Sequence, residues 1–117
     1  MSHDQLRSSR AWDLLLWLLR RRQRFRITGM SMFPLLKPGD EVLLDPQAYR
    51  KQPPTINDLV VAQHPQQPQL RLIKRVVAVL EDGCYLKGDN SLESTDSRSF
   101  GAVSCKQVLG RVTCRFP

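Results

Sequence analysis

Residues 70–80, LRLIKRVVAVL, determine the fold class of this chain. The stretch begins by alternating apolar and basic side chains and then becomes continuously apolar, which is typical of a β-strand that enters a core. Lys74 stands at that transition. Its amine either lies on the solvent face of the strand or is buried, and the two alternatives predict different chemistry.

The residues around this strand have a similar character. Gly and Pro interrupt short runs of Val, Ile and Leu, a pattern that favours a mostly β chain. We predict strands at residues 41–45, 58–63, 70–80, 84–87 and 108–115. Turns are predicted at residues 37–40 and 81–83, and surface loops at residues 46–57 and 64–69.

The N-terminal segment differs from the rest of the chain. Residues 9–22 predict a helix with Ser9 as a candidate N-cap. The middle of this helix is apolar on most sides, so it must dock on its own domain, on a partner or on a lipid surface. Its apolar run is much shorter than the ~20 residues that span a bilayer, and residues 1–10 lack the pattern of a signal peptide. We therefore expect a helix and basic segment over residues 1–25, one compact β domain over residues 26–117, and no membrane crossing.

Charge is the other marked feature of the composition. The 117 residues fit a single domain, and the formal net charge is +7. Part of that charge lies in one run of arginines: Arg20, Arg21, Arg22, Arg24 and Arg26. Such a run forms a solvated face or attracts phosphate, from nucleic acid or from anionic lipid headgroups. Aromatic residues make up 7% of the chain, too few for a base-stacking platform, and we expect no nucleic-acid partner.

The cysteines argue against a metal site. Cys84, Cys105 and Cys114 form no CxxC pair and have no histidine at ligand spacing, so we expect no metal and no cofactor. An odd number of cysteines without a disulfide framework suits a reducing compartment. We expect a cytoplasmic protein, peripheral to a membrane at most.

Ser31, in the stretch GMSMFP at residues 29–34, has three interpretations: turn filler, a buried hydroxyl or a nucleophile. A nucleophilic serine needs a base. If Lys74 is buried, its pKa falls from about 10.4 toward neutrality, and the neutral amine can deprotonate a serine hydroxyl. His64 lies in a predicted exposed loop and His3 near the terminus, which makes both weaker candidates for the base.

Three segments, in this order, resemble the signal-peptidase-type serine proteases that use a Ser/Lys dyad. They are Ser-Met-Phe-Pro at 31–34, Lys-Arg-Val at 74–76, and GDNSLESTDSR at 88–98. Residues 109–112 are similar to the closing strand of that family. The resemblance implies a mostly β, signal-peptidase-like domain and serine endopeptidase activity without a metal or cofactor.

The same resemblance assigns a role to individual residues. Ser31 matches the nucleophile and Lys74 the general base. Ser94 matches a hydroxyl that orients the lysine, and Asp96 and Arg98 match an ion pair that braces the site.

Four further residues belong to the resembling motifs. Met32 and Pro34 complete the serine motif, and Asp89 belongs to the Gly-Asp-Asn motif. The N–H of Ser31 is expected to donate to the oxyanion. Gly29 stands where some relatives carry a serine whose hydroxyl adds a second donor, so that side-chain donor is missing here.

Within the family, the short form with a Leu/Trp helix and an arginine run is most similar to the nickel-type superoxide dismutase maturation proteases. This similarity implies removal of an N-terminal extension from the dismutase precursor, bound as an extended peptide. One alternative is a membrane-associated signal peptidase that acts on secreted preproteins, with the helix and arginines on lipid. The other is a self-cleaving repressor-like module, although the chain contains no helix-turn-helix and no Ala-Gly cleavage site in a linker.

Overall fold

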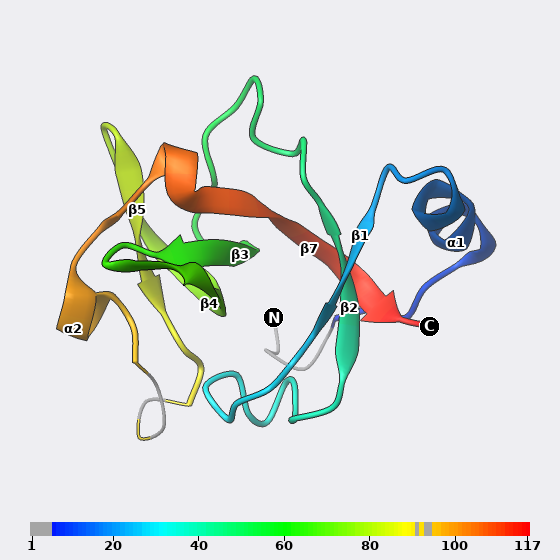
Figure 1. Cartoon of the computed structure of the whole chain (residues 1–117), viewed down its shortest axis with the longest axis horizontal. Coiled ribbons are helices and arrows are strands. Elements are labelled where there is room, and N and C mark those ends of the chain that lie inside the picture. The colour runs from blue at the N-terminus through cyan, green and yellow to red at the C-terminus, as the bar shows by residue number, and fades with distance from the viewer. Residues whose placement is uncertain (1–5, 91, 93–94) are drawn as a thin grey trace.

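The strands form one antiparallel sheet in the computed structural model, which describes residues 6–90, 92 and 95–117 (Figure 1). Seven strands of the described residues join it in the order β1-β2-β7-β3-β4-β5-β6. Their bounds are β1 Gln23–Arg26, β2 Glu41–Asp45, β3 Leu59–His64, β4 Gln67–Leu80, β5 Gly83–Lys87, β6 Val103–Ser104 and β7 Val108–Phe116. The helices are α1 Ala11–Leu18, α2 Ser97–Phe100 and the short 3₁₀ turn η1 Cys105–Gln107. The predicted fold class, mostly β with a short N-terminal helix, is confirmed.

β3 is buried on both faces and separates two apolar clusters. Leu59 and Val61 pack in one cluster, together with residues of β2, of β7 and of the range 27–36, which contains Ser31 and is called the serine segment below. Val60 and Ala62 pack in the other, against β5 and α2. Because successive side chains of a strand point to opposite faces, a continuously apolar strand of this kind lies between two cores.

The predicted helix over residues 9–22 is too long. α1 ends at Leu18, and residues 23–26 form β1, which pairs with β2. Arg20 has a φ of +62°, a conformation that no helix interior contains. The N-cap is Arg10 rather than Ser9, whose hydroxyl instead donates to the carbonyl of Arg115. β1 crosses the boundary expected at residues 25 and 26, and that boundary stays a prediction.

Residues 64–69 are not a surface loop, contrary to the prediction. β3 continues to His64, β4 begins at Gln67, and these two residues pair with each other. The turn is therefore limited to Pro65 and Gln66. His64 is buried, with its ring 4.7 Å from that of Phe100, so the expectation of an exposed histidine is also wrong.

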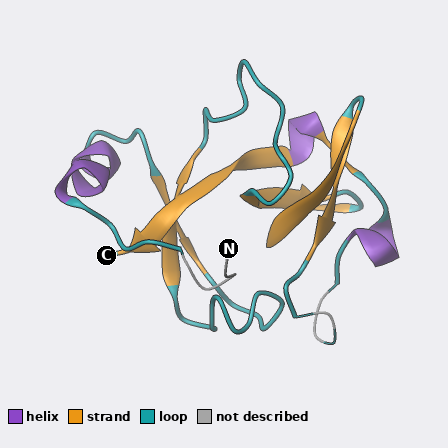
Figure 2. Cartoon of the chain, turned by 180° about the vertical axis from the view of Figure 1, so that it is seen from behind, coloured by secondary structure: helices purple, strands orange, loops and turns teal. Residues whose placement is uncertain are grey.

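α1 docks only partly on its own domain. Asp13 and Leu16 are buried, and the ring of Trp17 meets Phe116 of β7 edge to face at 4.8 Å. The opposite face is exposed and apolar: Trp12, Leu15, Leu18 and Leu19. α1 and α2 lie at opposite ends of the molecule (Figure 2). Within the described part of the chain, no helix has the length and apolar character that crossing a membrane requires.

The first half of β4 has an open edge. β3 pairs with β4 from Gln67 to Arg75, whereas β5 joins the other side of β4 only from Arg75 onward. Among the described residues, no strand pairs with residues 67–74 on that second side. Unpaired backbone N–H and C=O groups there can form hydrogen bonds with another extended segment.

Candidate active site

Ser31 lies in a tight segment that follows β1 and folds back on itself. The N–H of Ile27 donates to the carbonyl of Asp40, and the N–H of Gly39 donates to the carbonyl of Ile27, both at 2.8 Å. Gly39 has a φ of +92°, which favours glycine and explains the Gly-Asp of this turn. The adjacent Met32 is fully buried in the core. The turn and the core together fix both ends of the serine segment.

Asn90 holds the serine segment from the other side. Its backbone N–H donates to the carbonyl of Ser31 at 2.8 Å, and its side-chain amide donates to the carbonyl of Met30 at 3.1 Å. Among the described residues, no group accepts a hydrogen bond from the N–H of Ser31 itself. That N–H is therefore available to a ligand, as an oxyanion donor must be.

Lys74 is buried, with 3% of its surface exposed. It lies on the same face of β4 as Leu72 and Val76, both of which belong to the second apolar cluster or pack against it. This burial lowers the pKa of Lys74 from 10.5 to about 8; the nearby Asp96 raises it and Arg98 lowers it further. Of the two alternatives that the sequence leaves open, the structure shows the buried one.

Ser31 and Lys74 line the same cavity, which has a volume of about 190 Å³. One wall is the segment 27–31, and the other is the open-edged part of β4 from Leu70 to Lys74. Gly29 lies in the first wall, where a Cβ added to it meets no atom within 4 Å. Ser31 and a lysine of lowered pKa thus line one space beside the open edge of β4.

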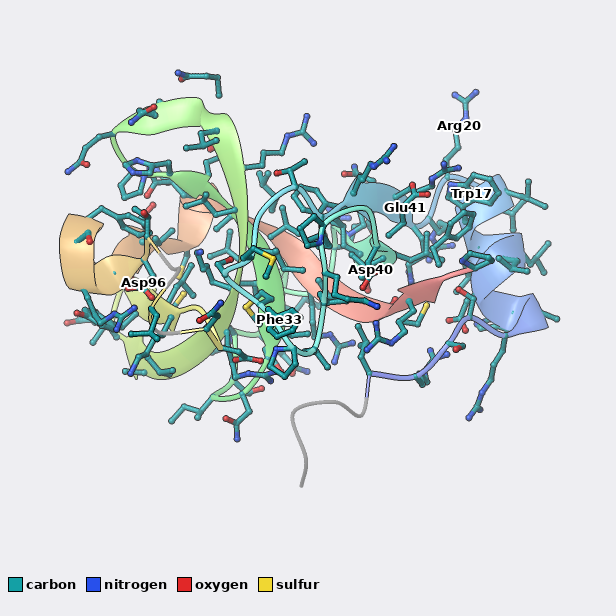
Figure 3. All side chains as sticks on the ribbon, turned by 90° about the horizontal axis from the view of Figure 1, so that it is seen from below. Trp17, Arg20, Phe33, Asp40, Glu41 and Asp96 are labelled. Atoms are coloured by element: carbon teal, nitrogen blue, oxygen red, sulfur yellow. The ribbon has the colours of Figure 1, made fainter. Side chains whose placement is uncertain are left out.

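Asp96 is fully buried and organises the region beyond Lys74 (Figure 3). It caps α2, and its carboxylate accepts hydrogen bonds from the N–H of Gly88 at 3.0 Å and from the guanidinium of Arg98 at 2.9 and 3.0 Å. The hydroxyl of Ser97 accepts a hydrogen bond from the N–H of Leu86 at 2.8 Å. These contacts attach α2 to the end of β5. Ser94, which the motif assigns to orienting Lys74, lies outside the described residues.

A second ion pair joins β4 to the Gly-Asp-Asn motif. Arg75 donates from two nitrogens to the two carboxylate oxygens of Asp89, each at 2.9 Å, and also to the carbonyl of Asn57 at 2.9 Å. The N–H of Asp89 points to the sulfur of Met32 at 3.5 Å. Asp89 and Met32 therefore support the serine segment, whereas Pro34 is exposed and is not among the residues that line the cavity.

Sequence reasoning did not single out Arg75 or Asn90, although both stand inside the quoted motifs. The signal for Asn90 was its place in a polar loop, directly after Asp89 in the Gly-Asp-Asn motif. The signal for Arg75 was its position one residue after the candidate base, where the alternation of a strand places its side chain away from that of Lys74.

The sequence is similar to those of known proteases. A family model described as signal peptidase, peptidase S26, matches residues 14–82 and 78–116. The mitochondrial ATP-independent inner membrane protease subunit 1b of Arabidopsis thaliana is 33% identical, in an alignment that covers 74% of this chain and 65% of the relative. Mitochondrial inner membrane protease subunit 2 of Danio rerio is 32% identical, with coverages of 75% and 60%. Subunit 1 from Xenopus tropicalis is 31% identical, with coverages of 75% and 65%.

This chain spans 60–65% of the length of these three relatives. The family model nevertheless includes the serine segment, β4 and the region of Asp96 and Arg98 in its two matched ranges. Because the match extends over most of the described residues, the chain belongs to the signal peptidase family, peptidase S26.

Proposed function

We propose that this protein is a serine endopeptidase in which Ser31 is the nucleophile and Lys74 the general base. One observation carries the proposal: a buried lysine with a pKa of about 8 lines the same small cavity as a serine. Most lysines are exposed, and burying one costs free energy that a purely structural role does not require. Family membership supports peptide hydrolysis as the reaction.

The reaction proceeds through an acyl-enzyme. Neutral Lys74 takes the proton of the Ser31 hydroxyl while the oxygen attacks the scissile carbonyl carbon. The N–H of Ser31 donates to the resulting oxyanion. The protonated amine of Lys74 then gives its proton to the leaving amine, and a water molecule, deprotonated by the same lysine, hydrolyses the ester. In this proposal Ser94 orients the lysine, and the Asp96–Arg98 pair braces the surrounding backbone.

The substrate binds as an extended peptide. The open edge of β4 at residues 67–74 offers main-chain hydrogen bonds to a strand that lies between it and the serine segment. We propose that the substrate is the N-terminal extension of a precursor protein. The motif resemblance makes the precursor of nickel superoxide dismutase the first candidate. The relatives are named inner membrane proteases, which favours the alternative of a membrane-associated signal peptidase that acts on secreted preproteins.

The dyad is tested by incubating the purified protein with the nickel dismutase precursor and sequencing the new N-terminus. Ser31→Ala and Lys74→Arg are each expected to lower kcat at least about 100-fold, because the first lacks the nucleophile and the guanidinium of the second stays protonated. Lys74→Met should lose activity equally but unfold at a higher Tm, because it removes a buried amine.

The exposed Lys37 supplies the matched control. Lys37→Arg and Lys37→Met should keep wild-type activity and change Tm little. Full activity of the Lys74→Arg protein would rule out the dyad. If a secreted preprotein is cleaved and the dismutase precursor is not, the substrate assignment alone is wrong.

The pH dependence of kcat/KM reports the base. The lowered pKa of Lys74 means that its reactive neutral form predominates only above about pH 8. We therefore expect kcat/KM to rise about tenfold per pH unit below that value and to level off above it. A profile that levels off between about pH 6 and 7 would indicate a histidine base and contradict the assignment.

Gly29→Ser tests the missing oxyanion donor. A side chain fits at this position, since an added Cβ meets no atom within 4 Å. The new hydroxyl is expected to raise kcat about tenfold, because one well-placed donor contributes that much or more to oxyanion stabilisation. Gly29→Ala is the control for backbone effects. Equal rates for the two variants would show that no donor is missing at this position.

We also propose that the protein works in the cytoplasm and that α1 rests on an anionic membrane surface. The exposed side of α1 carries Trp12, Leu15, Leu18 and Leu19, with 65%, 43%, 69% and 61% of their surfaces exposed. Arg20 and Arg21, which follow the helix, are exposed as well, and Figure 3 shows Arg20 pointing away from the domain. Apolar residues bordered by arginines are the composition of a helix that lies in the headgroup region. The three cysteines are free thiols, as in a reducing compartment.

Flotation with vesicles tests this contact. At low salt the protein should float with phosphatidylcholine vesicles that contain phosphatidylserine, and much less with phosphatidylcholine alone. The double variant Trp12→Ser, Leu18→Ser should lose flotation, whereas Leu92→Ser, which changes a residue that is 93% exposed elsewhere, should keep it. Equal flotation of both variants would assign the contact to another surface.

A further inference from the structure

In the part of the chain that the structure describes, the groove beside Ser31 carries basic side chains and no acidic one. Among the described residues that line its cavity, the charged ones are Arg71 and Lys74. Lys74 is buried and has a lowered pKa, whereas Arg71 is exposed, and guanidinium groups are not deprotonated in proteins. Arg71 is therefore the permanent charge of the groove.

Arg71 differs from the other arginines near the site in its contacts. Arg75, four residues along the same strand, is paired with Asp89, and Arg98 is paired with Asp96. Among the residues that the structure describes, no ion pair joins Arg71 to a carboxylate, and no hydrogen bond from its guanidinium is formed. Its guanidinium therefore keeps its donors for a ligand in the groove.

The register of β4 sets where a ligand would meet this charge. Arg71 pairs with Gln63 of β3, and its other side belongs to the open edge of β4. A peptide strand added at that edge places a residue directly opposite Arg71, with Cβ atoms about 5 Å apart. This residue lies three positions along the peptide from the one opposite Lys74. Because three is odd, Arg71 and Lys74 project from opposite faces of the sheet, so the two contacts do not compete.

We propose that Arg71 is a specificity-determining residue that selects substrates with Asp or Glu opposite it, three positions from the residue that faces Lys74. The inference rests on the proposed endopeptidase function and narrows its substrate class to peptides with an acidic residue at one defined distance from the cleaved bond. A guanidinium and a carboxylate side by side on neighbouring strands form a favourable cross-strand pair.

Peptides with a single variable residue test this selection. A cleavable parent peptide receives Asp, Asn or Lys in turn at each of the four positions on either side of the bond. At one position, three or four residues from the bond, wild type should prefer Asp over Lys about 5-fold in kcat/KM, as expected for a solvent-exposed pair. Arg71→Glu should reverse the order at that position only, and 1 M salt should reduce the preference.

Arg50→Glu is the matched control, because Arg50 is also exposed but lines a different cavity. It changes the net charge equally and should leave the preference intact. The same peptides are also bound to the Ser31→Ala protein and followed by fluorescence anisotropy, so that selection is measured whether or not a bond is cleaved.

Failure of the proposed endopeptidase function and failure of the proposed role of Arg71 give different results. If wild type cleaves no peptide while the Ser31→Ala protein still binds the Asp peptide most tightly, the proposed function is wrong and Arg71 still selects acidic ligands. If Asp, Asn and Lys peptides are cleaved and bound equally, or if the preference survives in Arg71→Glu, the role of Arg71 is overturned. Absence of binding by every peptide overturns it as well.

Discussion

The burial of one amine is the constraint on which the site depends. Lys74 lies on the inner face of β4, and burial lowers its pKa from 10.5 to about 8, a difference that corresponds to roughly 3 kcal/mol. The negative charge of Asp96 by itself raises the pKa of Lys74. Its pairing with Arg98 places a positive charge beside the negative one, and Arg98 itself lowers the pKa of Lys74. The ion pair therefore contributes to the chemistry of the lysine as well as to the attachment of α2.

The serine segment is positioned by residues that are distant in sequence. Asn90 binds the carbonyls of Met30 and Ser31, while its neighbour Asp89 is held by Arg75 next to the lysine. A single chain of contacts thus runs from β4 through the Gly-Asp-Asn motif to the serine. These hydrogen bonds hold the carbonyls of the two peptide planes on either side of the Ser31 Cα, and the Ser31 N–H lies in the first of these planes. That donor is therefore oriented before any ligand arrives.

Much of the fold is predictable from local patterns, and the exceptions have physical reasons. Residues 41–45 are a short apolar run that lies between a predicted turn and a predicted loop, and β2 matches that prediction at both ends. β1 is a four-residue strand at the sheet edge, stabilised by pairing with β2 rather than by its own composition, and it was not predicted. The helix over residues 9–22 was predicted too long because its leucines and arginines favour helix up to the start of β1. The burial of Lys74 could not be predicted, because the alternation of a strand assigns side chains to two faces but does not show which face other elements cover. His64 was misplaced because two prolines suggested a loop where only Pro65 and Gln66 turn.

The open edge of β4 carries residues that disfavour pairing with a second copy of the chain. An unpaired strand edge attracts other edges, and proteins commonly protect such edges with proline or with charged side chains. β4 has both within its unpaired part: Pro68 lacks the N–H that a second strand would need, and Arg71 would face Arg71 of another copy in a symmetric antiparallel pair centred on that residue. An incoming peptide with a carboxylate at that place meets attraction where a second copy meets repulsion. Under the proposed role of Arg71, the same side chain would disfavour self-association and favour an acidic ligand.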